Sequence, residues 1–233
     1  MPYLRPTLKW AAHPGRTYVQ RELTLLSPPA SIERRQRVLS TEELSKLLPV
    51  LRASDSAYAA AMQFLLLTAC RRDEAVTARW RDIDFINKQW RLPDTKSGKP
   101  HVVPLSRQAG ALLRSRLPDM PDAEALVFHS DDGGGSPLAN WDRFTKTVQE
   151  DSGTDGWHRH DLRRTAATMM GQAGVDPHVI EAALGHVSIH SQLAATYNVA
   201  RYLPQVADAL QALADRLDAV ASGGAEVRAI KRV

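Results

Sequence analysis

The sequence has 233 residues, of which 43% are hydrophobic and 24% charged, proportions that are ordinary for a soluble globular protein. No apolar run approaches the roughly 18 residues that a membrane-spanning helix needs, and the first ten residues lack the apolar core of a secretory signal, so we expect a cytoplasmic protein with no membrane partner. The single cysteine, Cys70, excludes an internal disulfide and argues against a cysteine-based zinc site.

The net charge of +4 is compatible with nucleic acid binding but does not by itself indicate it. The charge is unevenly distributed, because residues 1–37 carry seven Arg and Lys against two Glu, a net of +5. The remaining residues together sum to −1. Affinity for phosphate in the body of the chain must therefore come from a few well-placed cations.

Shifts in composition predict three segments along the chain. Residues 1–37 form a basic N-terminal remnant, with one short helix from Leu4 and a Pro/Ser-rich linker, and are too short to fold alone. Residues 38–220 are expected to form the globular domain. Residues 221–233 are polar, glycine-bearing and basic, and we expect a disordered tail.

Hydrophobic periodicity predicts that the globular domain is mainly helical. Ser40 followed by Glu43 three residues later is a capping box at the start of its first helix. Residues 57–69 are rich in alanine and leucine and almost free of charge, which indicates a buried central helix. A short helix is predicted after Glu74, ending near residue 78. Further helices are predicted at residues 109–117, 137–150, 160–171, 177–184, between 185 and 193, and at 204–220.

Three short apolar stretches predict strands. Residues 83–85 and 90–92 flank a polar turn at Asn87 and Lys88, as in a hairpin. A second turn at 96–99 leads to a third strand at 101–104. The expected fold class is therefore α+β, mainly α with one small three-stranded antiparallel β-sheet.

Several segments carry residues suited to phosphate chemistry, although each alone has an ordinary structural explanation. Arg71 lies at the end of the buried central helix with Glu74 one turn on, an arrangement typical of a helix-end cation and its partner. Lys96 lies in a turn, where a solvated lysine is common. His160 and Arg163 are three apart on a predicted helix and so share a face, pairing a proton carrier with a permanently charged guanidinium.

Two further candidates lie towards the C-terminus. Gly185 lets the chain turn sharply at a helix end and would project the imidazole of His186 from a fixed corner, although a lone histidine there is more often a cap. Tyr197 lies in an alanine-rich stretch, where a tyrosine is normally a core or rim residue.

In combination, the order of these motifs resembles that of the tyrosine recombinase (phage integrase) family. The matching sequence motifs are T-x-x-R-x-x-E at 68–74, K-x-G at 96–98 before V-P-L at 103–105, H-D-L-R-R-T at 160–165 and L-G-H at 184–186. The resemblance covers about residues 33–217, and the 160–165 block is its most specific part. It implies the tyrosine recombinase catalytic-domain fold and a site-specific recombinase or integrase of a mobile genetic element.

The resemblance also implies a role for each matching residue. Arg71 and Arg163 would hold the non-bridging oxygens of the scissile phosphate. His160 would handle a proton and His186 would hydrogen-bond the phosphate. Lys96 would protonate the leaving 5′ oxygen.

The nucleophile implied by the resemblance is Tyr197. Tyr202 is the competing position, but the spacing after His186, the run A-A-T-Y and the last helix starting near residue 204 favour Tyr197. Its product would be a 3′-phosphotyrosyl link with a free 5′ hydroxyl, formed without metal or other cofactor. The implied partners are double-stranded DNA and further copies of the chain, with possible exchange of the C-terminal helix.

The residue types fit this chemistry. Negative charge grows on the phosphate oxygens in the transition state, and losing one donor that stabilises such charge typically costs roughly 10²–10³ in rate. A tyrosine hydroxyl with a pKa of about 10 must lose its proton during attack, so a base is needed. The leaving alkoxide needs an acid on the opposite side.

The sequence departs from the family pattern in two places. Ala69 replaces the glycine that usually follows Thr68, a mild change that should preserve the helix end. The N-terminal DNA-binding domain usual in the family is represented only by a fragment near residues 8–12. We therefore expect either an isolated catalytic domain or a truncated gene, with weak and strongly salt-dependent DNA binding.

Three other interpretations remain open from the sequence. One is a truncated DNA-binding integrase remnant without catalysis. Another is a type IB topoisomerase, which uses the same kind of phosphotyrosine chemistry. The third is a zinc protein, although no carboxylate or cysteine lies at a recognisable ligand spacing from the histidines at 158, 160, 178, 186 and 190.

Overall fold

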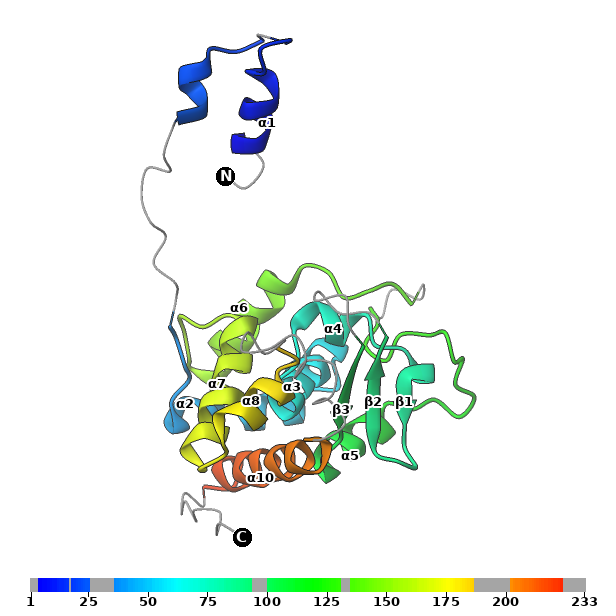
Figure 1. The fold of residues 1–233 in the computed structure, drawn as a ribbon. Coiled ribbons are helices and arrows are strands. Elements are labelled where there is room, and N and C mark those ends of the chain that lie inside the picture. Colours follow the sequence, from blue (N-terminus) through cyan, green and yellow to red (C-terminus); the bar gives the residue numbers. More distant parts are fainter. Residues whose placement is uncertain are drawn as a thin grey trace. The chain divides into compact units, whose positions relative to one another are not determined.

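The computed structural model describes residues 4–16, 18–25, 36–93, 100–130, 135–186 and 202–223. The chain divides into two compact units, residues 1–36 and 37–233 (Figure 1). The first unit contains helix α1 (Leu4–Ala11) and the 3₁₀ helix η1 (Arg21–Leu25). Its described side chains make one cation–π contact, in which the guanidinium of Arg16 lies 4.2 Å from the centre of a Trp10 ring.

The second unit is mainly helical and carries one small sheet, so the predicted fold class is confirmed. Its helices are α2 (Thr41–Ala53), α3 (Ala57–Thr68), α4 (Arg72–Val76), η2 (Trp80–Asp82), α5 (Arg107–Ser115), α6 (Trp141–Ser152), α7 (Arg159–Gln172), α8 (Pro177–Ala183) and α10 (Leu203–Ala221). Its strands are β1 (Ile83–Asp84), β2 (Gln89–Leu92) and β3 (His101–Pro104). Over the ranges that the structure describes, none of the helices has both the length and the apolarity to span a bilayer.

Helix α3 lies at the centre of this unit, as its alanine- and leucine-rich sequence predicts. It packs against α2, α5 and α7, and almost every side chain that it carries is buried. Helix α2 begins with the predicted capping box, because the Ser40 hydroxyl accepts from the Glu43 N–H at 3.1 Å and the Glu43 carboxylate accepts from the Ser40 N–H at 2.8 Å. Both helices are specified locally, by caps and by apolar composition.

The sheet is antiparallel with the order β1-β2-β3, as predicted. Trp90 on β2 pairs with Ile83 on one side and with Val103 on the other. The Trp90 side chain is fully buried against Phe64 of α3, with ring centroids 5.1 Å apart. The sheet is therefore fixed to the central helix by a large aromatic contact.

Helix α6 starts later than the sequence predicts. The prediction began it at residue 137, but Pro137 forms an isolated bridge with His129 and α6 begins at Trp141. Asn140 precedes the helix in the left-handed conformation, with φ of 53°, so the backbone before Trp141 is not helical. Other predicted segments lie wholly or mainly outside the described residues: the linker at 27–29, the turn at 96–99, the loop at 131–136, the helix ending near 193 and the C-terminal tail.

Helix α10 packs on its own unit, against α2, α8, α7 and β3. Its apolar face is the predicted one, with Val206, Leu210, Leu213 and Leu217 buried. Its polar face is also bound to neighbouring helices. Asp218 accepts from Arg52 of α2 at 2.5 Å, and Asp215 accepts from Arg107 of α5 at 2.8 Å.

Cys70 follows the central helix and is buried, and this burial raises the pKa of its thiol to about 12. Since the thiolate is the reactive form, we expect a disulfide reagent to modify almost none of the folded protein at pH 8. One thiol per chain should react after unfolding in urea, with absorbance of the released reagent as the measurement. Rapid modification of the folded protein would show that this end of α3 opens readily.

Candidate active site

Arg163 on α7 joins three segments that are distant in sequence. Its side chain is buried, with 5% exposed, and its Nη1 donates to the carbonyl of Ala69 at 2.7 Å. Its Nη2 donates to the carbonyl of Leu184 at 2.7 Å and to Nε2 of His186 at 3.2 Å. The guanidinium therefore holds the end of α3 and the end of α8 at one point, together with His186.

Arg71 lies next to this point, immediately before α4. Its Nη1 donates to the Glu74 carboxylate at 2.7 Å, and its backbone N–H donates to the same carboxylate at 2.7 Å. The predicted support of Arg71 by Glu74 is therefore present. The pKa of Arg163 is lowered by burial and then by the charge of Arg71, although such a guanidinium stays protonated at neutral pH. Arg71 and Arg163 thus place two guanidinium groups in the same region, an arrangement suited to binding an anion.

His186 leaves α8 through a tight turn of the predicted kind. Gly185 has φ of +61°, and its N–H and that of His186 donate to the carbonyls of Ala182 and Glu181, the Schellman pattern. Nδ1 of His186 lies 2.7 Å from the Glu181 carboxylate. These partners assign a neutral ring with its proton on Nδ1, because Nε2 accepts from Arg163.

His160 lies in the first turn of α7, with its side chain exposed while that of Arg163 is buried. The two are nevertheless coupled, because the pKa of His160 is lowered by partial burial and then by the charges of Arg164 and Arg163. Its neutral form is therefore favoured at neutral pH, and this is the form that can accept a proton.

This lowered pKa predicts the pH dependence of DNA cleavage. The single-turnover rate should stay level from about pH 8 to the ordinary histidine pKa of about 6.5 and fall only below it, as the ring is protonated. The variant His160→Gln should cleave roughly 10²-fold more slowly and lose this acid limb. An unchanged rate, or the same acid limb in the variant, would remove His160 from the reaction.

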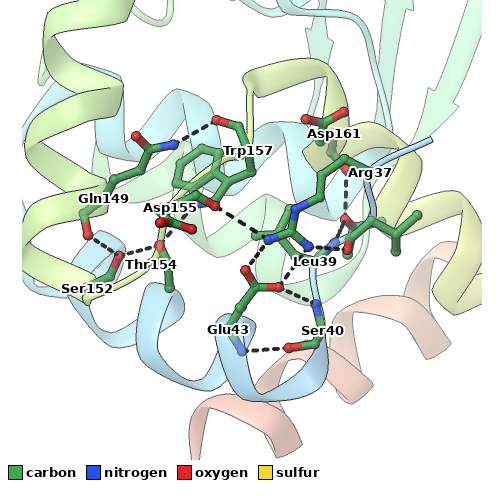
Figure 2. Close-up of polar contacts among 12 residues, drawn as sticks. Arg37, Leu39, Ser40, Glu43, Gln149, Ser152, Thr154, Asp155, Trp157 and Asp161 are labelled. Atoms are coloured by element: carbon green, nitrogen blue, oxygen red, sulfur yellow. Dashed lines mark hydrogen bonds and ion pairs between the residues drawn. The ribbon is translucent and has the colours of Figure 1, made fainter. Parts of the chain in front are cut away.

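The N-terminal end of α7 is anchored by a network that the sequence did not predict (Figure 2). Arg37 binds the Glu43 carboxylate and also donates to the carbonyl of Val38 at 2.7 Å. The N–H of Leu39 donates to the Thr165 hydroxyl at 2.9 Å, which itself donates to the carbonyl of Asp161 at 2.7 Å. The segment that enters this unit is thus bound directly to the helix that carries His160 and Arg163.

Asp161 completes this anchor. It is 1% exposed, and its carboxylate accepts from the N–H of His158 at 2.9 Å and from Arg164 at 3.0 Å. An acidic residue three positions after a helix cap is a local signal that could have identified this role. The contact between Leu39 and Thr165 carries no such signal, since it joins distant segments.

Replacing Thr165 by Val keeps the side-chain shape but leaves the buried Leu39 N–H without its acceptor. We expect a loss of about 1–3 kcal/mol in the free energy of unfolding, measured by urea denaturation. Thr147→Val is the matched control, because the Thr147 hydroxyl is exposed on α6 and donates to the carbonyl of Arg143 in the same helix. Equal stability of both variants would show that the anchor contributes little.

The structure thus brings four of the six predicted site residues to one region: Arg71, Arg163, His160 and His186. The other two, Lys96 and Tyr197, lie outside the described residues. Within the ranges that the structure describes, no group of three or more His, Cys, Asp or Glu side chains is arranged to hold a metal ion.

Comparison with known proteins identifies the family of the chain. Residues 37–202 match the model of the phage integrase family. The chain is 32% identical over 187 residues to prophage integrase IntA of Escherichia coli (strain K12), covering 78% of this chain and 44% of that protein. It is 28% identical over 170 residues to tyrosine recombinase XerD of Bifidobacterium longum (strain NCC 2705), covering 65% and 55%. The chain therefore spans less than two thirds of these relatives.

Solved structures agree on the fold. Lambda integrase (75–356), as a dimer bound to a COC′ core site, superposes with a TM-score of 0.60 at 19% identity, covering 79% of this chain and 70% of that chain. The integrase from mycobacterium phage Brujita superposes with a TM-score of 0.57 at 18% identity, covering 96% and 75%. The fold is that of a tyrosine recombinase catalytic domain. The chain belongs to the phage integrase family.

Proposed function

We propose that this chain is the catalytic part of a site-specific DNA recombinase, which cuts and rejoins DNA through a 3′-phosphotyrosyl intermediate. The observation that carries the proposal is the junction of Arg163 with His186, with Arg71 beside it. A phosphate diester placed here would meet two guanidinium groups and an imidazole. The names of the relatives, integrases and tyrosine recombinases, support the same reaction.

In the proposed reaction the Tyr197 phenol attacks the phosphorus and the 5′ oxygen leaves. His160 takes the phenol proton, and Lys96 gives a proton to the departing 5′ oxygen. Arg71 and Arg163 stabilise the charge that grows on the non-bridging oxygens. Attack by another 5′ hydroxyl reverses these steps and reseals the strand, so the energy of the bond is conserved.

The geometry also indicates how His186 would change partners. Its Nε2 accepts from Arg163 in the structure and so is not free to donate to a phosphate oxygen. A phosphate bound by Arg163 would replace this acceptor. Nε2 of His186 could then take up a proton and donate it to a phosphate oxygen, while Nδ1–H still donates to Glu181.

We further propose that the chain acts on duplex DNA as an oligomer of identical subunits, with residues 38–220 as its catalytic domain. Among the structural neighbours, lambda integrase is seen as a tetramer bound to a Holliday junction. Exchange of the C-terminal helix would require α10 to leave its own unit. The contacts of Asp218 with Arg52 and of Asp215 with Arg107 would have to break.

The test uses duplexes carrying candidate attachment sites, with a nick one or two nucleotides downstream of the scissile phosphate. Loss of the short 5′-hydroxyl fragment traps the intermediate, so the proposal predicts a protein–DNA adduct that survives heating in detergent. DNA binding in a native gel without any adduct would favour the non-catalytic remnant. Relaxation of supercoiled DNA without strand exchange would favour the topoisomerase reading.

A further inference from the structure

We propose that His101 is a positioning residue, whose ring seats the Gly185–His186 corner so that His186 meets Arg163. The inference rests on the proposed function, since it assigns a role in the same site. His101 is the first residue of β3 and lies five positions after Lys96 in the sequence. It is not one of the residues that the motifs identify.

The first observation is the contact between His101 and Gly185. A Cβ atom added to Gly185 would lie 3.1 Å from Cδ2 of His101 and 3.3 Å from both Cγ and Nε2. The ring therefore occupies the space that a side chain at position 185 would need. A glycine at position 185 is thus favoured twice, by its positive φ and by this close approach.

The second observation is the environment of the ring. Nε2 of His101 is buried and makes no hydrogen bond within the part of the chain that the structure describes. Burial lowers the pKa of His101, opposed by a hydrogen bond with the backbone of Ala183 and by the charge of Glu74. The ring is therefore neutral at pH 7 and adds no charge beside Arg163 and Arg71.

These contacts form a short path from the sheet to the proposed phosphate site. His101 lies on Gly185, the next residue is His186, and Nε2 of His186 accepts from Arg163. Trimming His101 would leave a gap under the corner. The imidazole of His186 could then shift, and a misplacement of about 1 Å can cost roughly 10²-fold in rate.

The test compares His101→Ala, the conservative variant His101→Gln and the control His129→Ala. His129 is also half-buried, but its ring lies against the carbonyl of Ser130 and its backbone pairs with Pro137. We expect His101→Ala to lower the single-turnover rate on the nicked duplex about 10- to 100-fold, with DNA affinity changed less than about twofold. His101→Gln, which restores a planar polar group, and His129→Ala should stay within about threefold of wild type.

A double-mutant cycle with Gly185→Ala tests the contact itself. If the ring and the added methyl group compete for one space, the double variant should cleave faster than the product of the two single effects predicts. Multiplicative effects would overturn the contact. A wild-type cleavage rate in His101→Ala would overturn the positioning role.

A readout without activity separates this inference from the proposed function. The imidazole ¹H–¹⁵N signals of His186 should shift in His101→Ala and remain in place in His129→Ala. If wild type forms no adduct but these signals shift, the proposed function fails and the positioning contact stands. If wild type forms the adduct but the His186 signals do not move, the positioning role is wrong.

Discussion

Replacing Tyr197 by Phe should abolish the covalent adduct on a nicked duplex, to below about 10⁻⁴ of the wild-type rate. The phenol oxygen is the atom that would bond to phosphorus, and phenylalanine has no atom that can replace it. DNA binding should be unchanged, because the substitution removes only the hydroxyl group and keeps the aromatic ring. The measurement is the yield of detergent-stable adduct over time, together with a native gel on the same samples.

Tyr202→Phe is the matched control, since Tyr202 is the other tyrosine after His186. Tyr202 is the residue immediately before α10, and its ring centroid lies 4.9 Å from that of His178. It is half-buried beside the core, a place typical of a structural tyrosine. We expect its adduct yield to stay within about twofold of wild type. Loss of the adduct in Tyr202→Phe, with survival in Tyr197→Phe, would reassign the nucleophile.

The second large effect concerns Arg163. Replacement by Lys keeps the charge but loses the planar fork, which donates to Ala69, Leu184 and His186 at once. We expect cleavage to fall roughly 10²–10³-fold, the usual cost of losing a donor that stabilises transition-state charge. The protein should also unfold at lower urea concentration, because the carbonyls of Ala69 and Leu184 lose a charged donor.

Arg164→Lys provides the comparison for this variant. Arg164 is the next residue on the same helix, and its side chain pairs with Asp161 at 3.0 Å. A lysine can retain that single ion pair, so cleavage should change less than about threefold. Equal losses in the two variants would mean that positive charge on α7 matters more than the geometry of Arg163.

The helices that the sequence predicts best are those specified by neighbouring residues. Ser40 and Glu43 cap α2 within one turn, and the composition of α3 requires burial wherever the helix packs. The predicted start of α6 was wrong because apolar spacing does not show that Asn140 adopts a left-handed conformation. Ala69 also has a left-handed conformation, with φ of 52°, and it follows the last residue of α3 where the family usually has glycine. Here the helix end is preserved, as predicted.

In the site, too, the features set by neighbouring residues were predicted and the long-range contacts were not. The motifs predict Arg71 and its partner Glu74, which are one turn apart, and the corner at Gly185. They do not predict that Arg163 is held by the carbonyls of Ala69 and Leu184. Backbone carbonyls carry no sequence signal, and these contacts join segments that meet only after folding.

The most direct measurement is to locate the DNA on the trapped protein by mass spectrometry. Trypsin cleaves after Arg164 and Arg201, so Tyr197 is the one tyrosine in the peptide 165–201, and Tyr202 falls in the next peptide. After nuclease digestion of the adduct, the peptide 165–201 should carry a 3′-linked nucleotide phosphate on Tyr197. A nucleotide on the peptide that begins at Tyr202, or on neither peptide, would contradict the proposed reaction.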